Sequence, residues 1–540
     1  MTEFSSRYHN RELGLLAFNT RVLAQAADRD YPLLERLKFL CIVSSNLDEF
    51  FEIRVAGLKA EIQKGSAPIS PDRLPAAEAF GHVSRKAHEL VADQYRLLNE
   101  EILPQLAMQG IRFLRRGELS PLQAEWVHEY FVNQVRPLLT PIGLDVAHPF
   151  PRVLNKSLNF AVELEGDDAF GRSSRIAIVQ APRVLPRIIA VPVGVAQGTH
   201  DFVFLSSVLH AHMAQLFPGM RVGGCYQFRV TRNSELFVDE EEIKDLRAAL
   251  SGELPSRHLG DEVRLEVATT CSAAMSHFLL DEFHLRQDDL YCVDGPVNLA
   301  RLVYVPDVVD RPDLKFPRFT PGVPQGLEQE ANLFAAIQNG DILLHHPFQT
   351  FQPVLAFLEQ AARDPSVVAI KQTVYRTGSE SQVMEKLILA ARNGKEVTVV
   401  VELLARFDEE ANINWAQRLE DAGAHVVYGV VGYKTHAKML MVVRRERERL
   451  RRYVHLSTGN YHSRTSLLYT DMGLFTCNEA IGEDVHEIFS QLTGLGRAAE
   501  LKCLWEAPFT LHDQVIAAIR REAAHARAGG NARIIAKMNA

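Results

Sequence analysis

The sequence predicts a multidomain protein that combines α and α/β domains, and three observations indicate this fold class. The chain has 540 residues, which corresponds to roughly three or four domains. Apolar residues recur at helical spacing over residues 1–105, whereas short strand-like and helix-like segments mix over residues 106–320. From residue 321 onward strands and helices alternate, as is typical of an α/β domain.

The composition excludes several classes of protein. Hydrophobic residues make up 47% and charged residues 23% of the chain, as in an ordinary globular protein with a large core. The formal net charge of −8 argues against a general nucleic-acid binder, whereas a local basic cleft for a polyanion is still compatible with it. No run approaches the roughly 20 apolar residues that span a bilayer. The first ten residues lack the layout of a secretory signal, and six scattered cysteines without a C-x-x-C pair favour a reducing cytoplasm.

Residues 1–105 are expected to form a helical domain. Within it, residues 44–51 are expected to lie between two helices. Ser45 or Asn46 would cap the following helix there, and the two carboxylates that come next would suit its first turn.

Residues 106–320 are expected to form an α+β domain. The predicted elements are strands at 160–164 and 176–179, a hairpin of 226–232 with 236–238, and helices at 240–249 and 273–283. This region shows no catalytic constellation, so its task is not predicted.

Residues 321–505 are expected to form an α/β domain with a largely parallel sheet and right-handed crossovers. The predicted elements are helices at 353–362, 382–392 and 409–422, and strands at 367–375, 397–404 and 425–430.

The stretch 431–460 carries the candidate catalytic residues. Side chains alternate along a strand, so His436 and Lys438 are expected to point to the same face, next to an apolar run that predicts a strand buried on both faces. Residues 444–452, with six arginines and two glutamates, are expected to form a solvated hairpin tip. The return strand leads to residues 458–460, a small-residue turn that lets backbone approach a ligand closely. Taken alone, the H-x-K pair is more typical of a surface strand with two exposed polar side chains.

Two arginines point to a phosphate site at the edge of the predicted sheet. Arg376 and Arg406 follow the ends of two successive strands, and ligands of such sheets bind outside the carboxyl ends of the strands. If the strand that starts at His436 runs antiparallel to its neighbours, His436 and Lys438 lie at the same edge. Arginine suits bidentate capture of phosphate oxygens, and lysine acts as a point charge.

A weak internal repeat links the opening of this domain to the last residues of the chain. Pro347-Phe348, a helix and a strand at 368–371 are echoed by Pro508-Phe509, a helix and residues 534–537. We interpret residues 506–540 as the start of a second α/β domain that is truncated; the alternative is a coincidence between two α/β openings.

Seven stretches together resemble a known family. They are SSNLDEFFEIRVAGLKAEI, HHPFQTFQPV, AIKQTVYRT, VTVVVELLARFDEEANI, YKTHAKM, STGNYHSRTSLLYTD and ARIIAKMNA. In this order and at these separations they resemble polyphosphate kinase, the ATP:polyphosphate phosphotransferase family, from Arg11 to Ala540. The resemblance implies a phospholipase D-like catalytic core with two H-x-K halves, of which residues 321–505 would be the first.

The resemblance also implies roles for individual residues. His436 would be the histidine that becomes phosphorylated, with Lys438 on the transferred phosphate, and Asn46 and Tyr469 would contact ATP. Arg376 and Arg406 would hold phosphates and are associated with the Mg²⁺ site. This association is expected to be indirect, through phosphate, because a guanidinium has no lone pair for a metal. In isolation Asn46 is more typical of a helix cap, and Tyr469 of a core tyrosine.

The implied reaction is reversible transfer of the γ-phosphate of ATP to inorganic polyphosphate through a phosphohistidine. ATP or ADP and Mg²⁺ would be the cofactors. The protein would form a homodimer or homotetramer in the cytoplasm, associated with a membrane surface, and would not bind nucleic acid. The family's last domain, with a second histidine, is almost wholly absent from this chain, so we expect the chain alone to make little polyphosphate.

Two alternatives stay open. A phospholipase D-like phosphodiesterase or nuclease would complete its site by dimerising, but Val443 stands where that motif carries an aspartate. A non-catalytic remnant would bind nucleotide without forming a phosphoenzyme.

Overall fold

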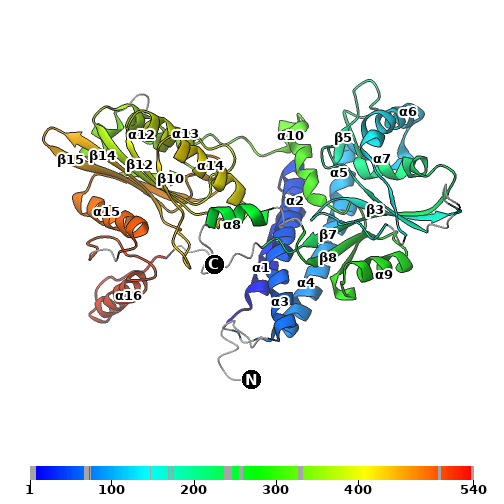
Figure 1. Cartoon of the computed structure of the whole chain (residues 1–540), viewed down its shortest axis with the longest axis horizontal. Helices are drawn as coiled ribbons and strands as arrows, with labels where there is room; N and C mark the ends of the chain where they lie inside the picture. Colours follow the sequence, from blue (N-terminus) through cyan, green and yellow to red (C-terminus); the bar gives the residue numbers. More distant parts are fainter. Residues whose placement is uncertain are drawn as a thin grey trace. The chain divides into compact units, whose positions relative to one another are not determined.

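The computed structural model of the chain divides into two compact units (Figure 1). Unit 1 comprises Met1–Leu236 and Pro255–Arg318, and unit 2 comprises Phe237–Leu254 and Phe319–Ala540. The predicted division into four domains is finer than these two units and stays a prediction. The residues that the structure describes are 8–65, 72, 74–145, 148–167, 171, 175–235, 246–254, 259–325, 327, 332–496 and 500–536.

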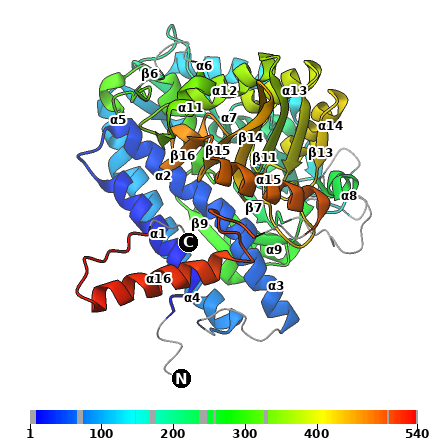
Figure 2. The same ribbon diagram turned by 90° about the vertical axis from the view of Figure 1, so that its left-hand side faces the viewer.

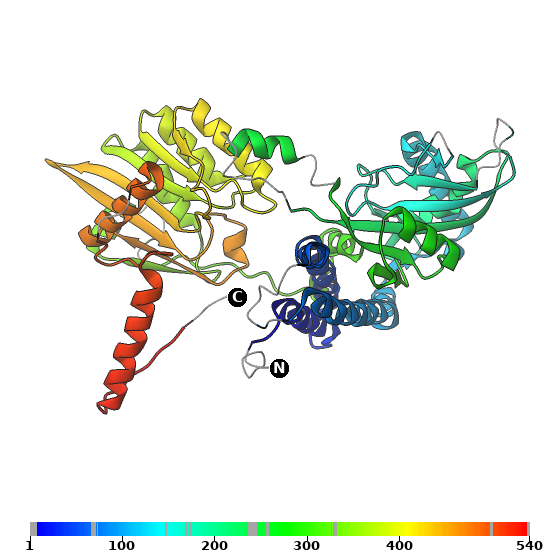
Figure 3. The ribbon, with the colours of Figure 1, turned by 60° about the horizontal axis from the view of Figure 1, so that its bottom comes forward.

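Unit 1 begins with a bundle of helices, as the spacing of apolar residues predicts. The helices of this unit are α1 Arg11–Ala27, α2 Leu33–Glu49, α3 Ala56–Lys64, α4 Ala76–Leu97, α5 Leu103–Met108, α6 Pro121–Tyr130, α7 Leu205–His212, α9 Ala273–Glu282 and α10 Val305–Val308. Helices α1 and α2 lie side by side in all three views (Figures 1 to 3). Their facing leucines are buried in one hydrophobic core.

The expected break at residues 44–51 is wrong. Helix α2 continues through a π-helical segment, η2 (Phe50–Val55), directly into α3. The apolar side chains Leu47, Phe50 and Phe51 are buried along this stretch, so the chain has no reason to leave the helix here. Asn46 is therefore an interior residue of α2 and not a cap. Polar residues typical of caps are tolerated because tertiary partners, described below, satisfy them.

Two sheets form the rest of unit 1. A six-stranded sheet has the order β2-β4-β3-β7-β8-β9, and a three-stranded sheet has the order β1-β6-β5. The strands are β1 Ile111–Leu114, β2 Ile142–Gly143, β3 Asn159–Glu165, β4 Ile176–Gln180, β5 Ile188–Ala190, β6 His200–Phe204, β7 Arg221–Arg232, β8 Glu262–Ala268 and β9 Leu290–Val293. The predicted strands at 160–164 and 176–179 and the helix at 273–283 correspond to β3, β4 and α9.

Two predicted elements of the middle region have a different outcome. Strand β7 pairs with β3 and β8, and residues 236–238, the predicted second strand of its hairpin, lie outside the described residues. The predicted helix at 240–249 is seen from Leu246 onward as α8 (Leu246–Glu253). This helix belongs to unit 2, where Arg247 forms an ion pair with Glu420 of α14.

Unit 2 is built on a seven-stranded sheet of order β10-β16-β15-β14-β11-β12-β13. Its strands are β10 Ile342–His346, β11 Val367–Val374, β12 Glu396–Val401, β13 His425–Val427, β14 Lys438–Glu446, β15 Arg449–Ser457 and β16 Asp471–Thr476. Its helices, besides α8, are α11 Leu333–Asn339, α12 Gln352–Arg363, α13 Gln382–Arg392, α14 Glu409–Asp421, α15 Glu479–Gly494 and α16 Leu511–Arg527. Helices α12 and α13 cover one face of the sheet and α15 the other (Figure 1).

The largely parallel sheet that the β/α alternation predicts is wrong. Only β11, β12 and β13 are parallel, and the four other neighbouring pairs of this described sheet are antiparallel. The helix-linked repeat ends at β13, and the chain then returns through the β14–β15 hairpin, which can only place strands antiparallel. The tip of this hairpin is also shorter than expected, because β14 runs to Glu446 and β15 starts at Arg449.

The last described segment is a helix and an extended stretch. Helix α16 (Leu511–Arg527) buries none of its side chains, and no strand forms over residues 531–536. The predicted strand at 534–537 is therefore wrong over its described part, while residues 537–540 lie outside the described residues. Among the helices that the structure describes, none combines the length and the apolar character needed to cross a membrane.

Candidate functional site

Strand pairing brings the predicted site residues to one edge of the sheet of unit 2. Strand β14 is antiparallel to β11, with Gln372 opposite Leu440, so the start of β14 lies beside the carboxyl end of β11. Lys438 is the first residue of β14 and pairs with Ser457 near the end of β15. The segments that carry Arg376, His436 and Thr458 therefore all leave the sheet at this edge.

The ring of Tyr375 is the centre of the site. The imidazole of His436 packs edge-on against it, with ring centroids 4.8 Å apart and an interplanar angle of 80°. The ammonium of Lys438 lies 4.9 Å from the centroid of the same ring, and the guanidinium of Arg376 lies 5.8 Å from it. An aromatic face attracts such cations. Three of the four residues predicted to act on phosphate are thus gathered by one tyrosine, which the sequence analysis treated only as the end of a strand.

His436 and Lys438 differ in exposure and both have lowered pKa values. Lys438 is 7% exposed, whereas His436 is exposed just before the strand. Desolvation, and then repulsion by Arg376, lower the pKa of Lys438 to about 8, although Asp471 acts in the opposite direction. Partial desolvation of its ring, followed by repulsion from Lys438 and Arg376, lowers the pKa of His436 below its ordinary 6.5. The imidazole is therefore neutral at neutral pH.

The backbone around His436 is held by two residues that sequence reasoning missed. The buried carboxylate of Glu402, just past β12, accepts hydrogen bonds from the backbone NH of Thr435 (2.7 Å) and of Leu404 (3.0 Å). The hydroxyl of Thr373 donates to the carbonyl of Ala437 (2.7 Å). The loop before β14 is thus tied to the ends of β11 and β12. A buried acid directly after a buried strand is the signal that marks Glu402.

The two arginines are connected through their loops. Arg376 Nη2 donates to the backbone carbonyl of Arg406 at 3.3 Å, and its Nε lies 3.5 Å from Asp408 Oδ2. Burial raises the pKa of Tyr375, while Arg376 and Arg406 act to lower it, so both cations act on the ring at the centre of the site. The Arg376 side chain is 44% exposed, which leaves its guanidinium accessible to a phosphate.

The turn at residues 458–460 packs closely against the side chain of Asp471. The hydroxyl of Thr458 donates to Asp471 (2.9 Å), and a Cβ at Gly459 would lie 2.4 Å from an oxygen of the same carboxylate. Only glycine therefore fits at position 459 beside Asp471. The side-chain oxygen of Asn460 is buried and has no hydrogen-bond partner among the described residues.

The two predicted ATP contacts, Asn46 and Tyr469, lie in different units. Asn46 is half-buried on α2 of unit 1, and its amide donates to Asn19 Oδ1 at 2.9 Å. Tyr469 is 59% exposed in unit 2, so the alternative of a core tyrosine is wrong. The nucleotide contacts of both residues stay predictions.

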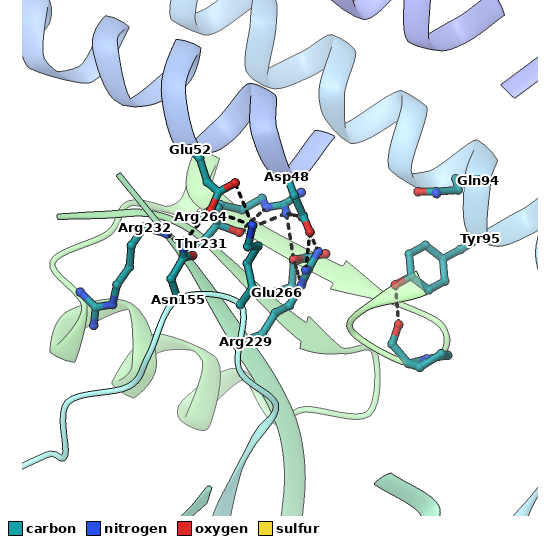
Figure 4. A network of polar contacts seen from close by, with 12 residues as sticks. Asp48, Glu52, Gln94, Tyr95, Asn155, Arg229, Thr231, Arg232, Arg264 and Glu266 are labelled. Carbon is teal, nitrogen blue, oxygen red and sulfur yellow. Dashed lines mark hydrogen bonds and ion pairs between the residues drawn. The ribbon is translucent and has the colours of Figure 1, made fainter. Parts of the chain in front are cut away.

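A buried ionic network holds the helix that carries Asn46 (Figure 4). Asp48 accepts hydrogen bonds from both Nη atoms of Arg229 (3.0 and 2.9 Å) and from Arg264 Nη2 (2.6 Å). Glu266 is ion-paired with both arginines. The carboxylate was expected to favour the first turn of a helix; it instead neutralises two guanidiniums of the six-stranded sheet.

A cavity of about 660 Å³ begins directly after Arg376. It is lined by residues 377–383, Glu385 and residues 461–464, and its wall does not include His436 or Lys438. The part of the chain that the structure describes holds no group of three or more His, Cys, Asp or Glu side chains able to bind a metal ion. The side chains at this edge of the sheet would therefore suit Mg²⁺ only if substrate phosphates supplied most of its oxygen ligands.

Comparison with known proteins identifies the family. Family models match the chain for the polyphosphate kinase N-terminal domain (residues 8–114), middle domain (122–305) and C-terminal domain 1 (332–498). A polyphosphate kinase of Burkholderia multivorans is 58% identical over 535 residues, which cover 98% of this chain and 78% of the relative. One from Burkholderia vietnamiensis is 58% identical over 542 residues, which cover 99% and 79%.

The fold agrees with this similarity. The crystal structure of polyphosphate kinase from Porphyromonas gingivalis superposes with a TM-score of 0.81 at 28% identity, covering 96% of this chain and 75% of that one. The expectation that the chain is a truncated member, with only the start of a second α/β domain, is not borne out by these matches. Three domain models and close relatives match nearly all of its residues, and the chain therefore belongs to the polyphosphate kinase family of phosphotransferase enzymes.

Proposed function

We propose that this chain transfers the terminal phosphate of ATP to polyphosphate, reversibly, with His436 as the nucleophile. The observation that carries the proposal is the gathering of His436, Lys438 and Arg376 around the ring of Tyr375 at one edge of the sheet. A neutral imidazole beside two cations is what transfer of a dianionic phosphoryl group requires. ATP, ADP and polyphosphate are the proposed ligands.

The first half-reaction forms a bond between an imidazole nitrogen of His436 and the γ-phosphorus of ATP. The bond from that phosphorus to the β–γ bridging oxygen breaks, and ADP leaves with the electron pair. In the second half-reaction a terminal oxygen of polyphosphate attacks the phosphohistidine, and the imidazole is regenerated. Two transfers replace one, as in other nucleophilic catalysis.

The remaining residues of the site would bind the phosphate oxygens or position His436. Arg376 and Arg406 would bind non-bridging oxygens of the phosphates. Lys438 would serve as a positive point charge near the transferred phosphate, and because its pKa is lowered to about 8, it would lose this charge at alkaline pH. Glu402 and Thr373 keep the backbone of His436 in place for in-line attack. Mg²⁺, when bound to the nucleotide, would neutralise charge on the β- and γ-phosphates.

A labelling experiment tests the nucleophile. Incubation with ATP labelled in the γ-phosphate should give a phosphoenzyme that is stable in base and lost in acid. His436→Ala should abolish the label, whereas His425→Ala, at an exposed histidine of the same unit, should retain it. Label that survives in His436→Ala at the wild-type level would refute the assignment, provided that both variants unfold at the wild-type temperature.

The phosphodiesterase alternative receives no support from the site. Val443, at the position where the phospholipase D motif carries an aspartate, pairs with Ala369 within the sheet and packs against the core under α15. This position offers no carboxylate to the edge where His436 lies. A cytoplasmic location, assembly into a homodimer or homotetramer, and association with a membrane surface stay proposals.

A further inference from the structure

A small cavity in unit 1 is lined by cations and by no carboxylate. It lies between the start of β5, the second half of β7 and the segment around residues 296–302. Four basic side chains line it, together with the polar groups of Ser206, Gln227 and Asn298; the four are Lys156, Arg187, Arg229 and Arg301. None of these residues belongs to the predicted catalytic site in unit 2.

Two of the four cations are already neutralised. Lys156 forms an ion pair with Glu52 at 2.8 Å. Arg229 is paired with Asp48 at 2.9 Å and also with Glu266, in the buried network of Figure 4. These two side chains therefore shape the wall without adding surplus charge.

The other two cations have no such partner. Neither Arg187 nor Arg301 has an ion pair with a carboxylate in the described part of the chain, and Arg187 Nη1 is buried without a hydrogen-bond partner. Burial, followed by repulsion from Arg301 and Arg183, lowers the pKa of Arg187 to about 10. A partly buried guanidinium with a second one nearby is unfavourable unless an anion joins them.

The remaining walls suit a small polar ligand. The side-chain oxygens of Gln227 and Asn298 are also buried without partners among the described residues, so they can accept hydrogen bonds from a protonated oxygen or a bridging water. The cavity measures about 30 Å³, and about 10–15 Å³ of such space admits one water. This is room for one tetrahedral group and too little for a nucleoside. Arg301, which lines the cavity, is exposed to solvent.

We propose that Arg187 and Arg301 form a binding site for one phosphoryl group, either inorganic phosphate or the end of a polyphosphate chain. The two surplus positive charges match the charge of a phosphate dianion, and two guanidinium forks match its oxygens. The site is separate from the transfer reaction proposed above and does not depend on it.

Isothermal titration of the full chain with inorganic phosphate at low salt tests the site. To remove the predicted catalytic arginines, the titration is made in the Arg376→Ala/Arg406→Ala variant. Arg187→Gln and Arg301→Gln should each weaken binding by about ten- to a hundredfold, since each removes a charge-assisted hydrogen bond. Arg187→Lys should restore only part of it, because the fork is lost.

Arg183→Gln is the matched control, because Arg183 is exposed nearby but does not line the cavity. It should change the affinity by less than about threefold. Equal losses of phosphate affinity in Arg183→Gln and Arg187→Gln would mean that phosphate is attracted only by the general positive charge, and would overturn the proposal. Unchanged phosphate affinity in Arg187→Gln would also overturn it, as would the absence of phosphate binding to the parent Arg376→Ala/Arg406→Ala variant. Thermal unfolding checks folding: phosphate should raise the midpoint of the parent protein and not that of Arg187→Gln. Since Arg301 is exposed, Arg301→Gln decides the question if Arg187→Gln does not fold.

Tripolyphosphate and ADP distinguish the source of the phosphoryl group. Arg187-dependent binding of tripolyphosphate that is tighter than that of phosphate supports a site for a chain end. Arg187-dependent binding of phosphate alone supports a site for the free ion. ADP should not bury its nucleoside in this cavity, which is too small for it. Burial of the base would appear as protection of unit 1 peptides from hydrogen exchange on addition of ADP. Such protection, lost in Arg187→Gln, would overturn the proposal.

Discussion

Replacing Asp48 by asparagine should destabilise unit 1 strongly while leaving the shape of the side chain nearly unchanged. Burial alone would raise the pKa of the Asp48 carboxyl, but Arg229 and Arg264 outweigh burial and lower it. The carboxylate is thus ionised in the folded protein and accepts three charge-assisted hydrogen bonds. Asparagine keeps one acceptor oxygen and removes the charge.

The magnitude follows from what is left behind. Asp48, Glu266, Arg229 and Arg264 form a cluster without net charge, and all four are at most 6% exposed. Without Asp48, one Glu266 carboxylate has to balance two buried guanidiniums. Removing one partner of a buried ionic cluster costs about 3–5 kcal/mol. We expect a loss of this size in the free energy of unfolding of the region that α2 and β7 share.

Hydrogen exchange of the full chain measures this loss locally. Peptides from α2 (Leu33–Glu49) and β7 (Arg221–Arg232) should exchange faster in Asp48→Asn, whereas peptides from the unit 2 sheet serve as an internal reference. The control is Asp93→Asn, which breaks the exposed ion pair between Asp93 and Arg96 and should leave exchange unchanged.

A second substitution tests the electrostatic reason. Arg264→Met in the Asp48→Asn background returns the cluster to neutrality, with Glu266 facing Arg229 alone, and should recover part of the lost stability. If the two substitutions instead add, or if Asp48→Asn behaves like Asp93→Asn, the uncompensated charge is not what costs the energy and the reasoning is wrong.

The remaining predictions concern unit 2. Arg376→Ala or Arg406→Ala should slow phosphoryl transfer by about ten- to a hundredfold, with partial rescue by lysine, from the loss of about 1.5–3 kcal/mol per charge-assisted bond; normal turnover in both variants would contradict the phosphate site. The profile of kcat/KM against pH should fall on the acid side at a pKa below 6.5, as His436 gains a proton, and on the alkaline side near 8, as Lys438 loses one. Arg376→Ala removes a cation that lowers the pKa of His436, so its acid limb should move to higher pH, and an unmoved limb would show that His436 does not control it. Burial, and then His346, lower the pKa of His455 to about 3 from 6.5, so the ring stays neutral in the folded protein and takes up a proton only on unfolding. The contribution of the neutral His455 ring to the free energy of unfolding is therefore complete above the pKa of histidine in the unfolded chain. It declines as the pH falls, by about 1.4 kcal/mol between about pH 7.5 and about pH 5.5. His455→Gln should reduce this pH dependence of the free energy of unfolding in urea titrations, and an unchanged pH dependence would refute its assignment to His455.

Local pattern determined most of the elements of unit 2. The predicted helix at 382–392 corresponds to α13 at both ends, because Ser381 caps it and Asn393 ends it within the sequence itself. Helix ends such as those of α13 depend on neighbours a few residues apart, so the sequence is sufficient to predict them. The sequence also predicted that His436 and Lys438 lie on one side, and both side chains lie at the ring of Tyr375. Strand β14 begins at Lys438, however, so the alternation of a strand is not what places His436.

Features that depend on distant partners were not predictable in this way. Residues 44–51 have the polar composition of a helix start, yet Asp48 lies within a continuous helix because Arg229 and Arg264, far along the chain, neutralise it. The same holds for Glu402, whose carboxylate meets the NH of Thr435 only after β12 and β14 have joined one sheet.

The sequence by itself determined most of the helices and strands of unit 2, and which polar residues follow the ends of its strands. The tertiary structure decided strand direction, because the pairing of β14 with β11 is a contact between segments that local periodicity does not relate. It also decided the centre of the site at Tyr375 and the unneutralised pair of Arg187 and Arg301. Burial and the sum of surrounding charges are properties of the folded chain, and no window of sequence contains them.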